Sequence, residues 1–393
     1  MPRQTILISG AGIAGPTLAH FLLKRGFTPV LIDRAPGFRD GGYIIDFWGL
    51  GFDVAERMGI LPELRSNGYL MNRVEFVTAS GKRRSALGGG LFERSLHGRF
   101  LSIPRGGLAR AVYRTIENDV ETIFGDSIAG IVQHPDRVGV TFEHGPPRAF
   151  DLVIGADGLH SVVRSILFGP TPKFERYLGF YAASFLTKGY PRRDEHTYLS
   201  YAAPGRQISR YALRDDRSAF LFVFESREKI YPPDLVTQKQ ILRQTFSREP
   251  WVEWPEIEAR LEAVNELYFD AVSQIALPSW SLGRVALVGD AAFCPSLLAG
   301  EGSVLAMAGA YILAGELDRA EGDFARAFTS YERGFRPFIE RKQKSARAFA
   351  SSFAPKTSFG LFVRDQVLKL CAIPAVGNFL MRRFVADRFV LPE

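Results

Sequence analysis

Cysteine is scarce in this chain of 393 residues, which contains only Cys294 and Cys371. Two cysteines are too few for a disulfide framework or a structural zinc site, so the fold must rely on its core. Uninterrupted apolar runs of membrane-spanning length are also missing, which argues against integral membrane association. The first residues lead directly into a predicted strand, so we expect no signal peptide and a cytoplasmic location.

Long runs of one charge are missing as well, although the net charge is +7 at pH 7. The longest basic stretch is Lys82-Arg83-Arg84, and no basic helix with interleaved aromatic residues occurs. This scatter argues against nucleic acid as a partner, whereas a mildly basic surface suits an anionic nicotinamide cofactor. Phenylalanine is plentiful at 32 residues, which suits packed cores and an apolar pocket.

The N-terminal segment 5–34 has the pattern of a strand, a glycine-rich turn, a helix and a second strand. Within it, Gly10, Gly12 and Gly15 match G-x-G-x-x-G, with Ala14 before the last glycine. The first glycine allows the tight turn, the second lets a pyrophosphate approach the backbone, and the third lets the helix pack on its strand. The segment therefore predicts a dinucleotide site.

The end of the second strand carries Asp33, followed by Arg34. A carboxylate at this place can accept hydrogen bonds from ribose hydroxyls. Asp33 would also repel a 2′-phosphate, but the positive charge of Arg34 leaves that choice open. The pair adds specificity to the glycine motif.

A second strand-end motif occupies residues 151–164, DLVIGADGLHSVVR. Here Asp157 can accept from a polar ligand group, and Gly158 leaves room for that ligand. Ser161 and Arg164 follow at helical spacing. By itself the motif is compatible with any connection between a strand and a helix.

A third motif begins at residue 284, where RVALVGD ends in Gly289 and Asp290. The carboxylate of Asp290 can bind a sugar or polyol hydroxyl. The loop that follows contains Pro295, Gly300 and Gly302, and it leads its amides into a helix N-terminus, which favours negative charge.

The three motifs, in this order, resemble those of the class A flavoprotein aromatic hydroxylases, the group of para-hydroxybenzoate hydroxylase and the tetracycline-inactivating monooxygenases. The resemblance covers nearly the whole chain and implies that the ligand is FAD. By this resemblance Gly10, Gly12 and Gly15 hold its pyrophosphate, Asp33 its adenosine ribose, and Asp290 its ribityl chain.

The same resemblance assigns four further residues. Arg105, in SIPRGGLARAV, matches the arginine of the helix that flanks the cofactor. Asp157 and Gly158 match the motif between FAD and the nicotinamide cofactor, and Pro295 belongs to the loop beside the isoalloxazine ring.

The implied fold is α/β, with a Rossmann-like FAD-binding domain, an inserted and mainly antiparallel substrate sheet, and C-terminal helices. We assign residues 1–72, 98–172 and 276–320 to the FAD-binding domain. Residues 73–97 and 173–275 form the substrate-binding β-sheet domain, and residues 321–393 form the C-terminal helical region. Helical patterns are expected at 235–263 and at 321–353, with a break near Pro337, and in the tail around Pro374.

The implied chemistry belongs to the cofactor. NADPH or NADH reduces FAD, and the reduced flavin reacts with O2 to form a C4a-hydroperoxide that hydroxylates a hydrophobic aromatic or polycyclic small molecule. No metal is needed, and the protein is expected to be a monomer or a homodimer. Two alternatives stay open: a flavin-dependent reductase or oxidase on the same fold, and a non-catalytic FAD-binding protein that sequesters a substrate.

The chain departs from the family at two positions near the third motif. The family often has histidine where this chain has Phe293, and an aspartate in the following helix where this chain has Gly309. Phenylalanine can neither accept a proton nor donate a hydrogen bond. Proton handling near the flavin ring is therefore in question.

The substrate pocket is predicted from two segments of the chain. Asp46, Phe47 and Trp48 follow glycines that the family places near the flavin ring, so we expect them to line the pocket. His196, Tyr201 and Tyr211 lie in the expected substrate sheet. They could orient or deprotonate a phenol, or they could serve structurally.

Overall fold

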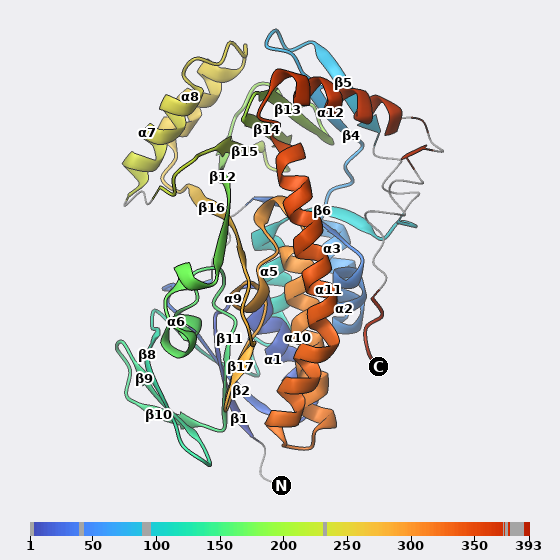
Figure 1. The fold of residues 1–393 in the computed structure, drawn as a ribbon. Coiled ribbons are helices and arrows are strands. Elements are labelled where there is room, and N and C mark those ends of the chain that lie inside the picture. Colours follow the sequence, from blue (N-terminus) through green and yellow to red (C-terminus); the bar gives the residue numbers. More distant parts are fainter. Residues whose placement is uncertain are drawn as a thin grey trace.

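The computed structural model describes residues 4–38, 43–88, 96–230, 234–371, 373, 376–377 and 389–393. Figure 1 shows two parts, with the N-terminal strands at the bottom and a larger sheet above them. The long helix α11 (Phe324–Phe353) runs beside both parts.

The lower part is built on a six-stranded sheet. Its strands lie in the order β17 (Ser281–Leu282), β18 (Val285–Leu287), β11 (Leu152–Gly155), β1 (Thr5–Ser9), β2 (Thr28–Asp33) and β7 (Glu121–Phe124). All of these pairs are parallel except β17 with β18. Strand β1 is buried because helices cover the sheet, and α1 (Ala14–Lys24) packs against α10 (Gly302–Arg319).

Smaller elements complete this part. A two-stranded sheet joins β3 (Ile44–Trp48) to β6 (Phe100–Pro104), and a three-stranded sheet joins β8 (Ile128–Gln133), β9 (Val138–Phe142) and β10 (Arg148–Phe150). The helices are α2 (Leu50–Met58), α3 (Leu61–Asn67), α5 (Arg105–Arg114), α6 (Val162–Phe168) and α9 (Asp290–Phe293), with short 3₁₀ turns at η1 (Thr171–Lys173) and η2 (Leu297–Ala299).

The upper part is a seven-stranded sheet. Its strands lie in the order β16 (Tyr268–Ile275), β12 (Glu175–Lys188), β15 (Arg217–Glu225), β14 (Arg206–Ala212), β13 (Thr197–Ala203), β4 (Arg73–Val77) and β5 (Arg83–Gly88). All neighbours are antiparallel except β13 with β4. Helices α7 (Leu235–Phe246) and α8 (Trp254–Ala263) cover one face, where Phe222 packs on Phe246 and Trp254. Helix α12 (Ser358–Cys371) lies beside β5.

The expected fold class is confirmed: a parallel sheet with helices is combined with a mainly antiparallel sheet and C-terminal helices. The expected break at Pro337 is wrong, because α11 continues through this residue. A proline removes one helical hydrogen bond, and the buried side chains of Phe335 and Phe338 on either side hold the helix on the core. The division into three regions stays a prediction, and Pro374 lies outside the described residues.

Candidate active site

Four strand ends meet at one edge of the six-stranded sheet. Strands β1, β2, β11 and β18 run parallel, so their carboxyl ends lie together, as ligand sites of α/β sheets require. A cavity of about 390 Å³ opens there. Twelve of the predicted residues line it: Gly10, Gly12, Ala14, Asp33, Arg34, Arg105, Asp157, Gly158, Asp290, Pro295, Gly300 and Gly302.

Gly10 and Gly15 shape the first turn, where their backbones lie too close to neighbours for any side chain. Gly10 has φ +110°, and a Cβ there would lie 2.5 Å from the carbonyl oxygen of Ala156. A Cβ on Gly15 would lie 1.9 Å from the carbonyl oxygen of Gly10. The absence of a side chain at Gly15 therefore lets α1 pack closely on β1. The resulting cradle of exposed backbone fits a pyrophosphate at the start of α1.

Asp33 joins the ends of β1 and β2. Its Oδ2 accepts from the N–H of Ala11 at 2.8 Å, and its Oδ1 accepts from the N–H of Ala35 at 2.8 Å. Each carboxylate oxygen keeps a further lone pair, and the side chain borders the cavity. The carboxylate of Asp33 therefore holds the turns after β1 and β2 and can still accept hydrogen bonds from ribose hydroxyls.

Asp157 also caps a helix, a role that was not predicted from the sequence. Its carboxylate accepts from the Ser161 hydroxyl and from the N–H groups of Val162 and Val163, at 2.8 and 3.1 Å. These bonds cap α6, because the first N–H groups of a helix have no partner inside it. Burial raises the pKa of Asp157, although its hydrogen bonds act in the opposite direction. Beside it, Gly158 has φ +79° and a Cβ position free of described atoms within 4 Å, which leaves room for a ligand.

Arg164 links the second and third motifs. Its guanidinium is fully buried and donates to the carbonyl oxygens of Ala291 at 2.9 Å and Leu159 at 2.6 Å. Burial lowers the pKa of this guanidinium, and nearby carboxylates, Asp157 first, oppose the shift. The spacing of Arg164 from Ser161 predicts that it lies on a helix. Its contact with Ala291 on α9 could not be predicted from the sequence.

Two tyrosines that the sequence did not single out line the same cavity. Tyr43 and Tyr268 have ring centroids 5.2 Å apart. Burial raises the pKa of Tyr43 to about 12, so its hydroxyl stays protonated at neutral pH. Burial likewise raises the pKa of Asp290, while the charge of Arg105 opposes that shift. Tyr268 is the first residue of β16 and lies far along the chain from Tyr43. Neither tyrosine belongs to a sequence motif, so their contact could not be predicted.

The loop after α9 is held by two glutamines. The side-chain N–H₂ of Gln343, on α11, donates to the carbonyl oxygens of Ile275, Cys294 and Phe293 at 2.7, 3.1 and 3.3 Å. Gln274 donates to the carbonyl oxygen of Pro295 at 2.7 Å. Ser296 adopts φ +115°, which a non-glycine residue rarely does. The loop that borders the cavity is thus fixed in a strained conformation by contacts from β16 and α11.

Phe293 lies in the core and does not line the cavity. Its ring packs against Trp280 and Phe335, with centroids 4.8 and 5.7 Å apart. A Cβ on Gly309 would lie 2.9 Å from this ring. The two positions at which the chain departs from the family are therefore in contact, and the glycine makes room for the phenylalanine. The Phe293 side chain does not line the cavity, and an effect of this residue on proton handling stays a prediction.

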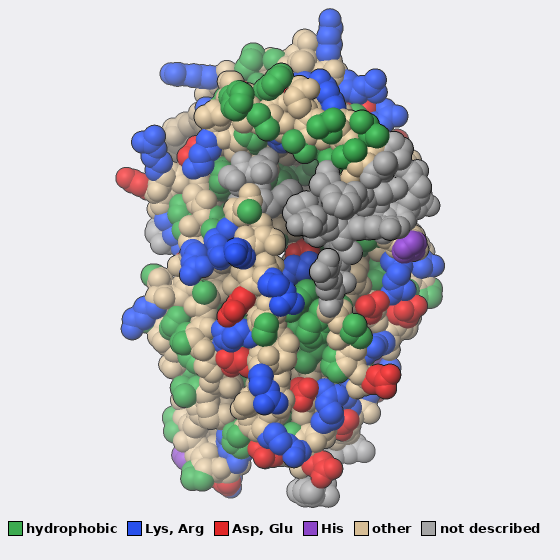
Figure 2. Space-filling model, turned by 45° about the vertical axis from the view of Figure 1, so that its right-hand side comes forward, with side chains coloured by type: hydrophobic (Ala, Val, Ile, Leu, Met, Phe, Trp, Pro, Cys, Tyr) green, Lys and Arg blue, Asp and Glu red, His purple; other side chains and the backbone are tan. Residues whose placement is uncertain are grey.

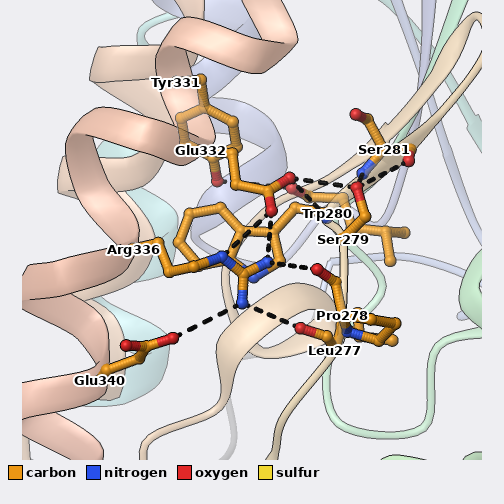
Figure 3. A network of polar contacts seen from close by, with 10 residues as sticks. Leu277, Pro278, Ser279, Trp280, Ser281, Tyr331, Glu332, Arg336 and Glu340 are labelled. Atoms are coloured by element: carbon orange, nitrogen blue, oxygen red, sulfur yellow. Dashed lines mark hydrogen bonds and ion pairs between the residues drawn. The ribbon is translucent and has the colours of Figure 1, made fainter.

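Figure 3 shows how the Trp280 side of this cluster is anchored. Arg336 donates to the carbonyl oxygens of Leu277 and Pro278 at 2.9 and 3.3 Å, and its guanidinium lies 4.8 Å from the Trp280 ring. Glu332 accepts from the N–H of Trp280 at 2.8 Å. Helix α11 thus fixes the segment before β17 against the back of the third motif.

The three predicted pocket residues on β3 point to two different faces, because side chains alternate along a strand. Asp46 and Trp48 share one face of β3, whereas Phe47 points to the other face and is buried in the lower core. Trp48 and Tyr211 belong to the same hydrophobic cluster beneath the large sheet. Asp46 accepts from the Ser102 hydroxyl at 2.6 Å, and burial raises its pKa.

Tyr201 and His196 do not belong to the cluster that contains Trp48 and Tyr211. Tyr201 faces α7 and α8, where it donates to Glu249 at 2.8 Å and stacks on Trp251. Side chains alternate along β13, so Tyr201 and Tyr198, three residues apart, point to opposite faces of the sheet. His196 is exposed just before β13, near the carbonyl oxygen of Leu70 at 3.2 Å. Substrate contact by Asp46, Trp48 and Tyr211 stays a prediction.

Neither a metal centre nor a membrane-spanning helix occurs among the described residues. They contain no group of three or more His, Cys, Asp or Glu side chains arranged to hold a metal ion. No helix in this part of the chain has the length and apolar character needed to span a bilayer.

Comparisons with known proteins agree with the geometry. The family described as an FAD binding domain matches residues 3–341. A flavin-dependent monooxygenase of Legionella longbeachae is 36% identical over 394 residues, which cover 99% of this chain and 97% of that protein. Among solved structures, tetracycline destructase Tet(55) has a TM-score of 0.84 and 32% identity, with 100% of both chains covered. Klebsiella pneumoniae HpxO complexed with FAD and uric acid shares the fold, with a TM-score of 0.77 and 22% identity over 93% of this chain and 92% of that one.

The cradle at Gly10, the cavity at the four strand ends and the family match lead to one conclusion. The resemblance to the class A flavin monooxygenases is confirmed. The chain belongs to the FAD binding domain family and is an FAD-dependent monooxygenase.

Proposed function

We propose that this monooxygenase uses NADPH or NADH and O2 to hydroxylate a hydrophobic aromatic or polycyclic small molecule. Bound FAD would supply hydride acceptance and oxygen activation. The chain's own residues bind the cofactor, position the substrate and exclude water. The tetracycline destructase among its structural relatives, at 32% identity, supports a polycyclic substrate class.

The observation that carries this proposal is a group of buried polar atoms between the two parts of the molecule. Among the described residues, Trp48 Nε1 and the hydroxyls of Tyr211 and Ser184 are buried and have no hydrogen-bond partner. Leaving such an atom unpaired costs about 1–3 kcal/mol, so a ligand with polar groups would be stabilised by pairing with these atoms.

These atoms lie on one side of the large sheet. Ser184 pairs with Leu221 and Tyr211 with Ala219, so their side chains share the face that lies away from α7 and α8. The same face of the sheet carries the apolar side chains of Phe180 and Val223, and Phe100 stacks on Trp48. The surroundings suit a molecule with a hydrophobic body and a few polar groups.

A second cavity brings this face close to the cofactor site. It has a volume of about 520 Å³ and is lined by Ser184, Leu186 and the segment 263–268. Tyr268 lines both cavities. A substrate at the sheet would therefore lie beside the FAD site.

The decisive experiment follows the visible absorbance of the flavin-loaded protein without oxygen after addition of NADPH or NADH. It is repeated with a panel of phenolic and polycyclic compounds. We expect one nicotinamide to bleach the flavin, and one compound to accelerate the bleaching. Admission of isotopically labelled O2 should then yield a product that carries one labelled oxygen atom.

Two other results would contradict the proposal. Flavin that both nicotinamides leave oxidised, whatever compound is present, would favour a substrate-sequestering protein. Reduction followed by a product without labelled oxygen would favour a reductase or an oxidase.

A further inference from the structure

Helix α12 presents an exposed apolar stripe. Phe359, Phe362, Val363, Val367 and Leu370 are 74, 55, 42, 47 and 54% exposed. Their spacing of three, four, eight and eleven residues from Phe359 places all five on one side of the helix. Figure 2 shows hydrophobic side chains gathered across the upper part of the molecule, where α12 lies. Soluble surfaces seldom keep such a stripe without a partner.

The opposite side of α12 accounts for its attachment to the protein. Leu361 and Asp365 are buried, and Asp365 accepts from the hydroxyl of Ser85 at 3.2 Å and pairs with Arg84 on β5. Arg364 donates to the side-chain oxygen of Gln207 at 3.1 Å, with its guanidinium 4.0 Å from the Phe76 ring. The helix is therefore anchored by one side, and the apolar stripe is exposed on the other side.

Among the described residues, the strongly exposed charges beside the stripe are of one sign. Asp365 is the only acidic residue of α12, and it points inward. Lys369 is exposed on the helix, and Lys82 and Arg83 are exposed beside the start of β5, the strand to which Asp365 is anchored. Glu75 lies 3.8 Å from Arg83 but is itself only 14% exposed. The rim of the stripe is thus basic.

We propose that the outer face of α12 docks on an anionic lipid surface. An apolar stripe with basic residues at its edge is the composition of helices that lie in the plane of a membrane interface. The apolar side chains enter the boundary of the acyl chains, and the basic residues meet the lipid phosphates. A second copy of this chain fits less well, because pairing two α12 faces would bring like charges together.

The test is flotation of the full-length protein with lipid vesicles. One set contains phosphatidylcholine alone, and the other contains phosphatidylcholine with phosphatidylglycerol. We expect binding to the anionic set, and weaker binding as salt rises, because salt screens the basic rim. The triple substitution Phe359→Ser, Phe362→Ser and Leu370→Ser should lower partitioning at least about tenfold, since each ring or branched chain contributes apolar area.

A matched control replaces three exposed apolar residues elsewhere, Val132→Ser, Val236→Ser and Val252→Ser, which are 59, 75 and 52% exposed. This control should float like the unchanged protein. A substitution of the rim, Arg83→Gln with Lys369→Gln, should reduce binding to anionic vesicles only. Thermal unfolding of each variant, with its flavin absorbance, verifies that the fold is retained.

The proposal is overturned if the unchanged protein floats with neither vesicle set at low salt. It is equally overturned if the α12 variant and the control bind alike. A dimer in light scattering that the α12 substitutions dissociate, without vesicle binding, would assign the stripe to a second copy of the chain.

Discussion

At the scale of single residues, Phe293 and Gly309 show how two departures from a family pattern can compensate for each other. The Phe293 ring occupies the space in which a side chain at position 309 would have to stand. Both residues lie inside a close-packed cluster with Trp280 and Phe335. Packing of this density responds to the addition of a single methyl group.

We therefore expect Gly309→Ala to lower the free energy of unfolding by about 1–3 kcal/mol, because its Cβ would meet the ring at 2.9 Å. Phe293→Leu should also destabilise the protein, by about 1–2 kcal/mol, through lost packing. The double variant should be less destabilised than the sum of the two, because the smaller side chain frees space for the new methyl group.

Urea unfolding of the four proteins measures this coupling. Gly334→Ala serves as the control, because no described atom lies within 4 Å of its Cβ position on α11. Additive effects in the double variant would disprove direct contact. Flavin reduction by nicotinamide should be unchanged in all four, since neither residue lines the cavity.

Asp46 supports a prediction about pH. Burial raises the pKa of this carboxyl above its ordinary value of 3.8. The folded state therefore keeps a proton that the unfolded state has already released, so this group's contribution to stability falls as the pH rises from about 4. Asp46→Asn removes the ionisation and can keep the hydrogen bond from Ser102.

We expect the Asp46→Asn variant to gain stability relative to the unchanged protein at pH 7 and to gain little at pH 4. Urea unfolding at both pH values measures the difference. The exposed Asp119→Asn is the control and should show no such change with pH. An equal effect of Asp46→Asn at both pH values would show that burial of this carboxyl does not shift its titration.

At the scale of elements, the loop between α9 and α10 depends on a side chain from α11. Gln343 is buried and satisfies carbonyl groups that precede the strained Ser296. Loops with this much irregular backbone need such partners, because a buried carbonyl without a donor is costly.

Gln343→Met keeps the approximate size of the side chain but removes the donor. We expect a loss of about 1–3 kcal/mol in the free energy of unfolding and weaker FAD binding, because the loop borders the cofactor cavity. Fluorescence titration of the apoprotein with FAD measures the second effect. The exposed Gln240→Met is the matched control, and equal FAD affinity in both variants would contradict a positioning role for Gln343.

At the scale of the whole molecule, the cofactor cavity joins segments from the first residues of the chain to residue 306. A ligand that binds only when these segments are assembled stabilises the entire fold. We expect FAD at one hundred times its Kd to add about 2.7 kcal/mol to the free energy of unfolding. Thermal unfolding at increasing FAD concentration measures this, and a midpoint that does not move would contradict the assigned cavity.

Much of the fold and of the candidate cofactor site could be predicted because the relevant signals are local. The glycine motif, Asp33 and the strand-end carboxylates each lie within a few residues of the strand that positions them. Strand alternation also explains why Asp46 and Trp48 share a face. It would have excluded Tyr201, but only if the pairing of β13 and its covered face had been known.

Backbone sterics and short-range spacing act along the chain, so the ends of the parallel strands, the glycines of the turns and a dinucleotide site were predictable without the fold. The folded structure was needed to show that Phe293 faces Gly309, that Tyr43 lies against Tyr268 and that Gln343 holds the loop beside the cavity. These contacts join residues far apart in the chain. Their partners are chosen by how helices and sheets pack, which no local pattern encodes.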